Sequence, residues 1–146
     1  MSVGLPPEIE SPYARARHLL RADAIFEVVL AGVILGGVLT GAMDGDDLPD
    51  AVADAVLIVV AIVAALFALG LWVAASAAHP SARGLALLAA LNAVTAVGAA
   101  AWLVSDNGAA SDLAMAVIAV AAAILFSLAV VQGRASSALA KKGTAR

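Results

Sequence analysis

Residues 55–75 read AVLIVVAIVAALFALGLWVAA, an apolar run without one charged side chain. The hydrocarbon core of a bilayer is about 30 Å thick, and a helix of about 20 apolar residues crosses it. Because the run is continuous rather than alternating, it does not have the pattern of a transmembrane β-strand. The segment therefore predicts a transmembrane helix.

Three further runs have the same character, at residues 24–43, 85–104 and 113–131, and Glu27 is the one charged residue inside them. The chain as a whole is 64% apolar and 13% charged. An ordinary soluble domain is about 45–50% apolar and about 25% charged, so this composition excludes a soluble enzyme, a disordered chain and a nucleic-acid binder. The sequence predicts an all-α polytopic membrane protein, a bundle of four transmembrane helices.

The basic residues all flank the spans on one side. They precede the first span, lie in the second connection or follow the fourth span: Arg15, Arg17, Arg21, Arg83, Arg134, Lys141, Lys142 and Arg146. The other two connections carry aspartates, including Asp44, Asp46, Asp47 and Asp106. Because basic loops stay in the cytoplasm, we predict a protein of the bacterial cytoplasmic (inner) membrane with both termini inside.

The spans divide the chain into a cytoplasmic segment 1–23, a membrane domain 24–132 and a basic cytoplasmic tail 133–146. In the first segment, Ser11 and Pro12 suit the start of a helix. Ser11–Arg21 forms either a short interfacial helix or an extension of the first span. We expect the small, polar tail after Gly133 to be frayed.

Small residues line one stretch of the first span, at Gly32, Gly36, Gly37 and Gly41. Lipid gives no hydrophobic drive for helix association, so close approach at such residues stabilises helix pairs. The stretch packs either against another span of this chain or against a second copy. The expected partners are therefore the lipid bilayer and a homodimer or larger membrane complex, and not nucleic acid.

Three spans each carry a polar side chain at a similar depth: Glu27, Asn92 and Ser127. By the helical rise, each lies about 9–13 Å from the nearest arginine flanking its own span. Ionisable residues inside a membrane mark functional sites by default. We expect a polar cluster near the cytoplasmic side in which Glu27 donates a hydrogen bond to the Asn92 carbonyl. Alternatively, Glu27 reaches water, and the Asn and Ser side chains only join helices.

Other kinds of site lack their residues. The chain has no Cys, which excludes disulfides and thiolate metal sites. His18 and His79 fall outside the spans, so no pair of histidines is placed to hold a haem in the membrane. Phosphate-binding and nucleophile motifs are absent. We therefore predict no cofactor, no metal and no catalytic residue.

Two short stretches carry a resemblance. Leu20-Arg21-Ala22-Asp23-Ala24 and Leu88-Ala89-Ala90-Leu91-Asn92-Ala93, with the spacing of the spans, resemble a broad group of small four-span integral membrane proteins of high-GC bacteria. The resemblance implies this fold and no particular activity. Ala24-Ile25-Phe26-Glu27-Val28 is also similar to the first span of small multidrug resistance exporters, although Glu27 is shallower and the later spans have fewer aromatic residues.

Three classes of function follow. The first is a non-enzymatic membrane protein: an accessory subunit, a scaffold or a stress-linked factor. The second is a small proton-coupled carrier or exporter that uses Glu27. The third is an enzyme acting on a lipid or isoprenoid with Glu27 as general acid or base.

Overall fold

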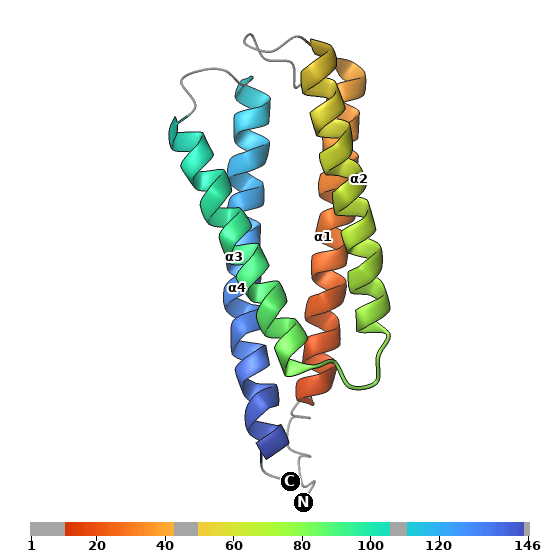
Figure 1. Ribbon diagram of the computed structural model, residues 1–146, viewed down its shortest axis with the longest axis vertical. Helices are drawn as coiled ribbons and strands as arrows, with labels where there is room; N and C mark the ends of the chain where they lie inside the picture. The colour runs from red at the N-terminus through yellow and green to blue at the C-terminus, as the bar shows by residue number, and fades with distance from the viewer. Residues whose placement is uncertain (1–10, 43–49, 106–110, 145–146) are drawn as a thin grey trace, which may run out of the picture.

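The computed structural model describes residues 11–42, 50–105 and 111–144, which form four helices. These helices are α1 (Pro12–Thr40), α2 (Asp50–Ala75), α3 (Ala82–Ser105) and α4 (Asp112–Thr144) (Figure 1). Each is long and apolar enough to cross a membrane. The prediction of an all-helical chain with four candidate membrane spans is confirmed. The acidic residues Asp44, Asp46, Asp47 and Asp106 lie outside the described part of the chain.

Serine side chains begin three of the helices. Ser11 Oγ accepts a hydrogen bond from Ala14 N at 3.2 Å, and the helix continues from Pro12 without a break. Ser81 Oγ accepts from Gly84 N, and Ser111 Oγ accepts from Ala114 N. Each serine satisfies a backbone N–H that the first turn leaves unpaired. Ser11–Arg21 is therefore the first part of α1, the extension that the sequence left as one of two options.

Gly41 ends α1 in the left-handed conformation, with φ 65°. Ala42 N donates back to Gly37 O at 2.9 Å, which pairs a carbonyl at the helix end. Glycine adopts this conformation without the steric cost that a Cβ imposes. Gly41 therefore terminates the helix. The sequence analysis had instead grouped it with the small residues that pack against another helix.

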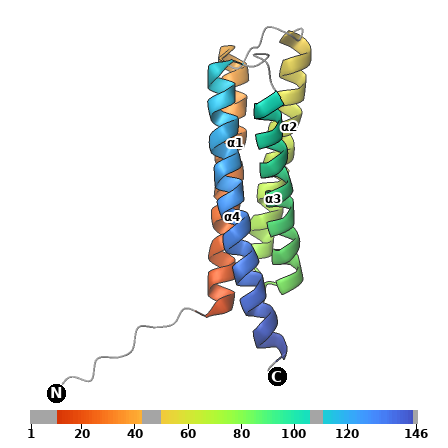
Figure 2. The same ribbon diagram turned by 90° about the vertical axis from the view of Figure 1, so that its left-hand side faces the viewer.

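The helices form two antiparallel hairpins, α1 with α2 and α3 with α4 (Figures 1 and 2). Contacts within each hairpin are extensive, and the hairpins touch each other mainly through α1 and α4. Seen from the face bordered by α2 and α3, the hairpins spread apart away from the chain termini (Figure 1). The molecule is thus two helical pairs held together mostly at one end.

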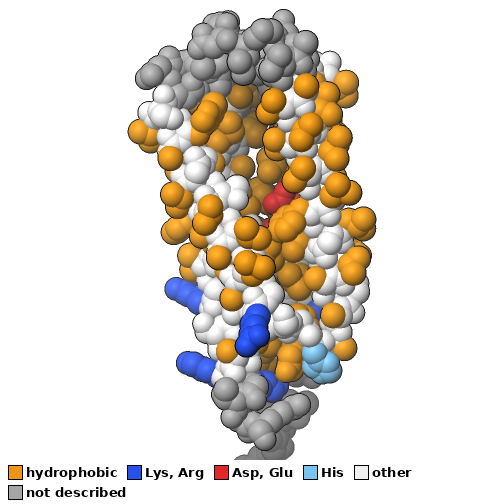
Figure 3. All heavy atoms as spheres, viewed as in Figure 1, with side chains coloured by type: hydrophobic (Ala, Val, Ile, Leu, Met, Phe, Trp, Pro, Cys, Tyr) orange, Lys and Arg blue, Asp and Glu red, His pale blue; other side chains and the backbone are white. Residues whose placement is uncertain are grey.

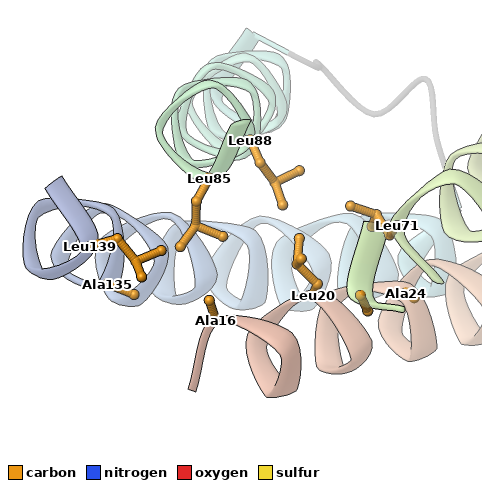
Figure 4. Packing of buried hydrophobic residues seen from close by; sticks show 9 residues of the cluster. Ala16, Leu20, Ala24, Leu71, Leu85, Leu88, Ala135 and Leu139 are labelled. Atoms are coloured by element: carbon orange, nitrogen blue, oxygen red, sulfur yellow. The ribbon is translucent and has the colours of Figure 1, made fainter. Parts of the chain in front are cut away.

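An apolar cluster closes the end at which the chain termini lie. All four helices contribute small or leucine side chains to it: Ala16, Leu20, Ala24, Leu71, Ala75, Leu85, Leu88, Ala135 and Leu139. Figure 4 shows Leu85 and Leu88 reaching from α3 toward α1 and α4. A second cluster, farther along, joins α1 to α2 alone, through Ala31, Ile34, Ala61 and Ala64. Buried apolar contact between the hairpins is therefore concentrated at the terminal end.

The tail expected to be frayed is helical, because α4 continues to Thr144. Ala135 and Leu139, one turn apart, are buried in the terminal cluster. Ser136 Oγ donates to the Ala82 carbonyl at 2.8 Å, which ties this part of α4 to the start of α3. Packing against neighbouring helices therefore orders the part of α4 after Gly133, although its small, polar composition does not by itself predict a helix.

Aromatic contacts join three elements at the same end. The Tyr13 and His79 rings meet edge to face at 5.0 Å between centroids, and Lys142 Nζ lies 5.4 Å from the Tyr13 ring. Arg21 lies over the Trp72 ring at 6.0 Å. The described Lys and Arg side chains occur toward this end of the helices, as Figure 3 shows for one face. We refer to it below as the basic end, and to the other as the far end.

Candidate functional site

Glu27 lies on the buried face of α1, with only 8% of its surface exposed. Ala24 and Ala31, one turn before and after it, are buried on the same face, while Val28 and Val29 beside it are exposed. The helical period therefore places the carboxyl on the buried face of α1 and not on the outer surface. The alternative in which Glu27 reaches freely into water does not fit this burial.

Three polar side chains from three helices meet between the hairpins. Asp23 of α1 and Gln132 of α4 are fully buried, and Asn92 of α3 is 3% exposed. Asn92 Nδ2 donates to Asp23 Oδ2 and to Gln132 Oε1, each at 3.0 Å. Gln132 Nε2 donates to Asp23 Oδ2 at 2.8 Å. We call Asp23, Asn92 and Gln132 the polar cluster.

The cluster is arranged around the Asp23 carboxyl group. Oδ2 accepts from two amide groups, and an ionised carboxylate is an acceptor only. Hydrogen bonds to a charged acceptor are about twice as strong as neutral ones. Oδ1 is buried and accepts no hydrogen bond from the residues that the structure describes. A buried acceptor without a partner is costly, so Oδ1 is the group in this cluster that calls for an explanation.

Asp23 and Glu27 are neighbours on one face of α1. Residues four apart in a helix have Cβ atoms about 5–6 Å apart, which brings the two carboxyl groups within interaction distance. The two groups also interact electrostatically. The residues of the other helices that meet the polar cluster are amides, and the nearest arginine on this helix, Arg21, turns toward Trp72. The site is a carboxyl pair held by amides.

The surface is hollowed between the two hairpins, on the far side of the polar cluster. Figure 3 shows this hollow, with acidic side chains at its inner end. Of the acidic side chains that the structure describes, those of Asp23 and Glu27 are buried, whereas Asp112 is the exposed first residue of α4. The hairpins meet again at the far end, where Ser111 Oγ donates to the Ala42 carbonyl at 3.3 Å. Acidic side chains thus lie between the hollow and the closed basic end (Figure 3).

The predicted cluster of Glu27, Asn92 and Ser127 is wrong in one member and incomplete. Ser127 is exposed and donates to Ala123 O of its own helix at 2.8 Å. Asn92 is buried as expected, but its side chain bonds to Asp23 and Gln132. The estimate used depth along each helix and took no account of direction around it. Ser127 and Gln132 are five residues apart, which turns them about 140° from each other.

Asp23 and Gln132 were missed because they fall just outside the predicted spans 24–43 and 113–131, two residues from Arg21 and Arg134. The signal was present in the sequence. Asp23 and Glu27 are spaced to share a face of the first helix. Gln132 and Ser136 are likewise one turn apart on the last helix, and both are buried. Polar pairs at this spacing in an apolar helix indicate a face that meets other protein.

The glycines expected to pack inside the chain divide into three groups. Gly37 is buried, and Gly41 is the cap described above. Gly32 and Gly36 are exposed, and a Cβ added at either would meet nothing within 4 Å. Their role in packing between helices of this chain is therefore ruled out, and the surface they form on α1 is open.

Within residues 11–42, 50–105 and 111–144, no group of three or more His, Asp or Glu side chains is placed to hold a metal ion. The chemistry that the site offers is hydrogen bonding and the binding or release of protons. No protein-family model matches the chain, and comparisons with curated proteins and with solved structures gave no match. The argument for function therefore depends on the site itself.

Proposed function

We propose that the chain is a multi-pass protein of the bacterial cytoplasmic membrane with both termini in the cytoplasm. Support comes from the gathering of Arg and Lys at the basic end, because basic segments are retained inside during insertion. In this orientation the apolar cluster closes the cytoplasmic end, and the hollow lies toward the outer half of the membrane.

Of the three classes that the sequence left open, the geometry supports best a small proton-coupled carrier. The observation that carries this proposal is the burial of Glu27 one turn from Asp23, a second buried carboxyl group that bonds to both helices of the other hairpin. Figure 3 shows acidic side chains at the inner end of the hollow. A purely structural polar contact between helices requires no ionisable group. A carrier requires one at the boundary between its open and closed ends.

The chemistry follows from competition for one carboxyl group. A carboxylate next to an apolar hollow binds either a proton or a cation with an apolar body, and it cannot hold both. Exchange of one for the other couples their movement, provided that the hairpins open alternately at each end. The concentration of buried apolar contacts at the basic end leaves the hairpins free to rearrange about the polar cluster.

The test is flux in proteoliposomes containing the purified protein, with an imposed pH gradient and tetraphenylphosphonium as the apolar cation. We expect gradient-driven flux in the wild type and loss of at least about tenfold in Glu27→Gln, which keeps the shape and removes the titration. Asp112→Asn, the same kind of change at an exposed position, is the matched control. Equal flux in Glu27→Gln and wild type would remove Glu27 from the mechanism.

A second function is favoured by a separate observation, the open glycine surface at Gly32 and Gly36. An accessory subunit or scaffold would use such a surface to approach a helix of another membrane protein or of a second copy. Gly36→Leu would then abolish co-purification of a partner, or a dimer, from native membranes without unfolding the chain. If the wild type carries no cation and this variant loses a complex, the accessory role replaces the carrier.

A further inference from the structure

We infer that Asp23 and Glu27 form a proton-sharing pair, and that Asn92 and Gln132 hold the basic end closed only while Asp23 is a carboxylate. The inference deepens the proposed function and rests on its proton coupling. It gives a role to Asp23, which the carrier proposal does not use. It also predicts a change in structure that can be measured when the pair takes up a proton.

The direction of the hydrogen bonds carries the first step. Both amide groups turn N–H donors toward Asp23 Oδ2, at 3.0 and 2.8 Å. The second Asn92 bond goes to Gln132 Oε1, so the two amides are also linked to each other. This arrangement suits an acceptor with a negative charge. Two of the three bonds connect α1 of one hairpin with α3 and α4 of the other, and both end on Asp23, so its charge contributes directly to hairpin contact.

The second step of the argument concerns Asp23 Oδ1, the carboxyl oxygen without a hydrogen-bond donor. Oδ1 is buried without a hydrogen-bond donor among the described residues, and Glu27 lies one turn away on the same face. A protonated Glu27 carries the O–H donor that Oδ1 lacks. The pair then holds one proton and one negative charge. Among the described residues, Asn92 of α3 and Gln132 of α4 bond to the pair at Asp23, and Ala24 beside it packs in the apolar cluster with Leu71 of α2.

A second proton changes the hydrogen bonding at the cluster. The Glu27 O–H bond breaks as an O–H bond forms on Asp23 Oδ1, and Glu27 then takes a second proton from a hydronium ion in the hollow. The hydronium ion becomes water, and the pair becomes neutral. The amide donors then face a neutral carboxyl, and the charge-assisted part of both bonds is lost. The hairpins remain joined at the basic end by the apolar cluster alone, and they separate more easily there.

The chain has no cysteine, so distances can be measured with spin labels at two introduced sites. Exposed Arg15 of α1 and Ser137 of α4 lie toward the basic end on different hairpins. In lipid nanodiscs, we expect the distance between labels to increase on acidification in the wild type and in the control Asp112→Asn. In Asp23→Asn it should be large at acidic and alkaline pH alike. A wild-type response in Asp23→Asn would overturn the inference.

A second variant keeps the test decisive if Asp23→Asn does not fold. Gln132→Met has similar length without a donor, and it should shift the distance in the same direction at alkaline pH. Infrared spectra supply an independent readout of the proton. The carbonyl band of a protonated carboxyl should be lost in Glu27→Gln, and it should shift in Asp23→Asn. A band that persists in Glu27→Gln would contradict proton sharing.

The outcomes separate this inference from the carrier itself. If the distance follows the charge of Asp23 but no cation flux is found, the proton-sharing pair stands and the carrier falls. If flux depends on Glu27 while Asp23→Asn leaves the distance unchanged, the carrier stands and the role of Asp23 falls.

Discussion

At the scale of single residues, Gln132 shows how much one amide can contribute in a membrane bundle. It is fully buried, donates to Asp23 and accepts from Asn92. Gln132→Met removes both bonds, so one Asn92 N–H loses its acceptor and Asp23 Oδ2 keeps only the bond from Asn92. We expect the free energy of unfolding to fall by about 1–3 kcal/mol, the cost of leaving a buried polar group without its partner.

Ser127→Ala is the comparison for that prediction, made on the same helix. The Ser127 hydroxyl is exposed and bonds only to its own backbone, so its removal should change stability by less than about 0.5 kcal/mol. Unfolding of both variants in mixed detergent micelles gives the two values. Equal losses would mean that Gln132 contributes nothing beyond helix formation.

Gln132 and Ser127 also show what could not be predicted from the sequence. Glu27 and Asn92 were noticed because any polar residue stands out in an apolar span, and both are buried in the structure. The helix face was not predictable in the same way. In a span that is apolar on every side, lipid-facing and protein-facing residues have the same composition, so the sequence has no amphipathic contrast to orient Ser127 and Gln132.

At the scale of elements, the proposed placement in the membrane puts two segments of α4 in different solvents. Its part before Arg134 is apolar enough to lie in lipid, whereas its last turns lie beyond that arginine and still pack on α1 and α3. There the hydrophobic effect acts as it does in a soluble protein. This explains why a short polar tail is an ordered part of the helix.

Leu139→Ala tests this view of the end of α4. Leu139 is 5% exposed in the terminal cluster, and removing such a buried leucine side chain costs about 2–5 kcal/mol. We expect thermal unfolding at a clearly lower temperature, with the loss of contact at the basic end visible in the label distance described above. Leu87→Ala is the control, because Leu87 is 64% exposed. If both variants unfold alike, the tail is not part of the core.

The positions of the helices along the chain were more predictable than which helices pack against each other. Apolar length is set by bilayer thickness, so the spans 55–75 and 85–104 fall within α2 and α3 of the structure. The pairing of α1 with α4 across the hairpins depends on buried side chains such as Asp23 and Leu139. Such contacts join distant parts of the chain and leave no local pattern.

At the scale of the whole molecule, the hairpins are asymmetric from end to end. Apolar packing and the polar cluster join them at the basic end, whereas the Ser111–Ala42 hydrogen bond joins them at the far end. A weak hydrogen bond such as this one exchanges for water more easily than a packed cluster. We therefore expect the far end to open first, and the direction in which the carboxyl pair exchanges protons is then set by the orientation of the chain.

Orientation is tested by labelling single cysteines introduced into a chain that has none. Val104 near the end of α3 is 88% exposed at the far end, and Ser137 is exposed toward the basic end. In intact spheroplasts, a membrane-impermeant maleimide should label Val104→Cys and spare Ser137→Cys, and permeabilisation should expose both. The reverse pattern would place the basic end outside. The hollow would then face the cytoplasm, and acidification from that side would be the signal that reaches Glu27.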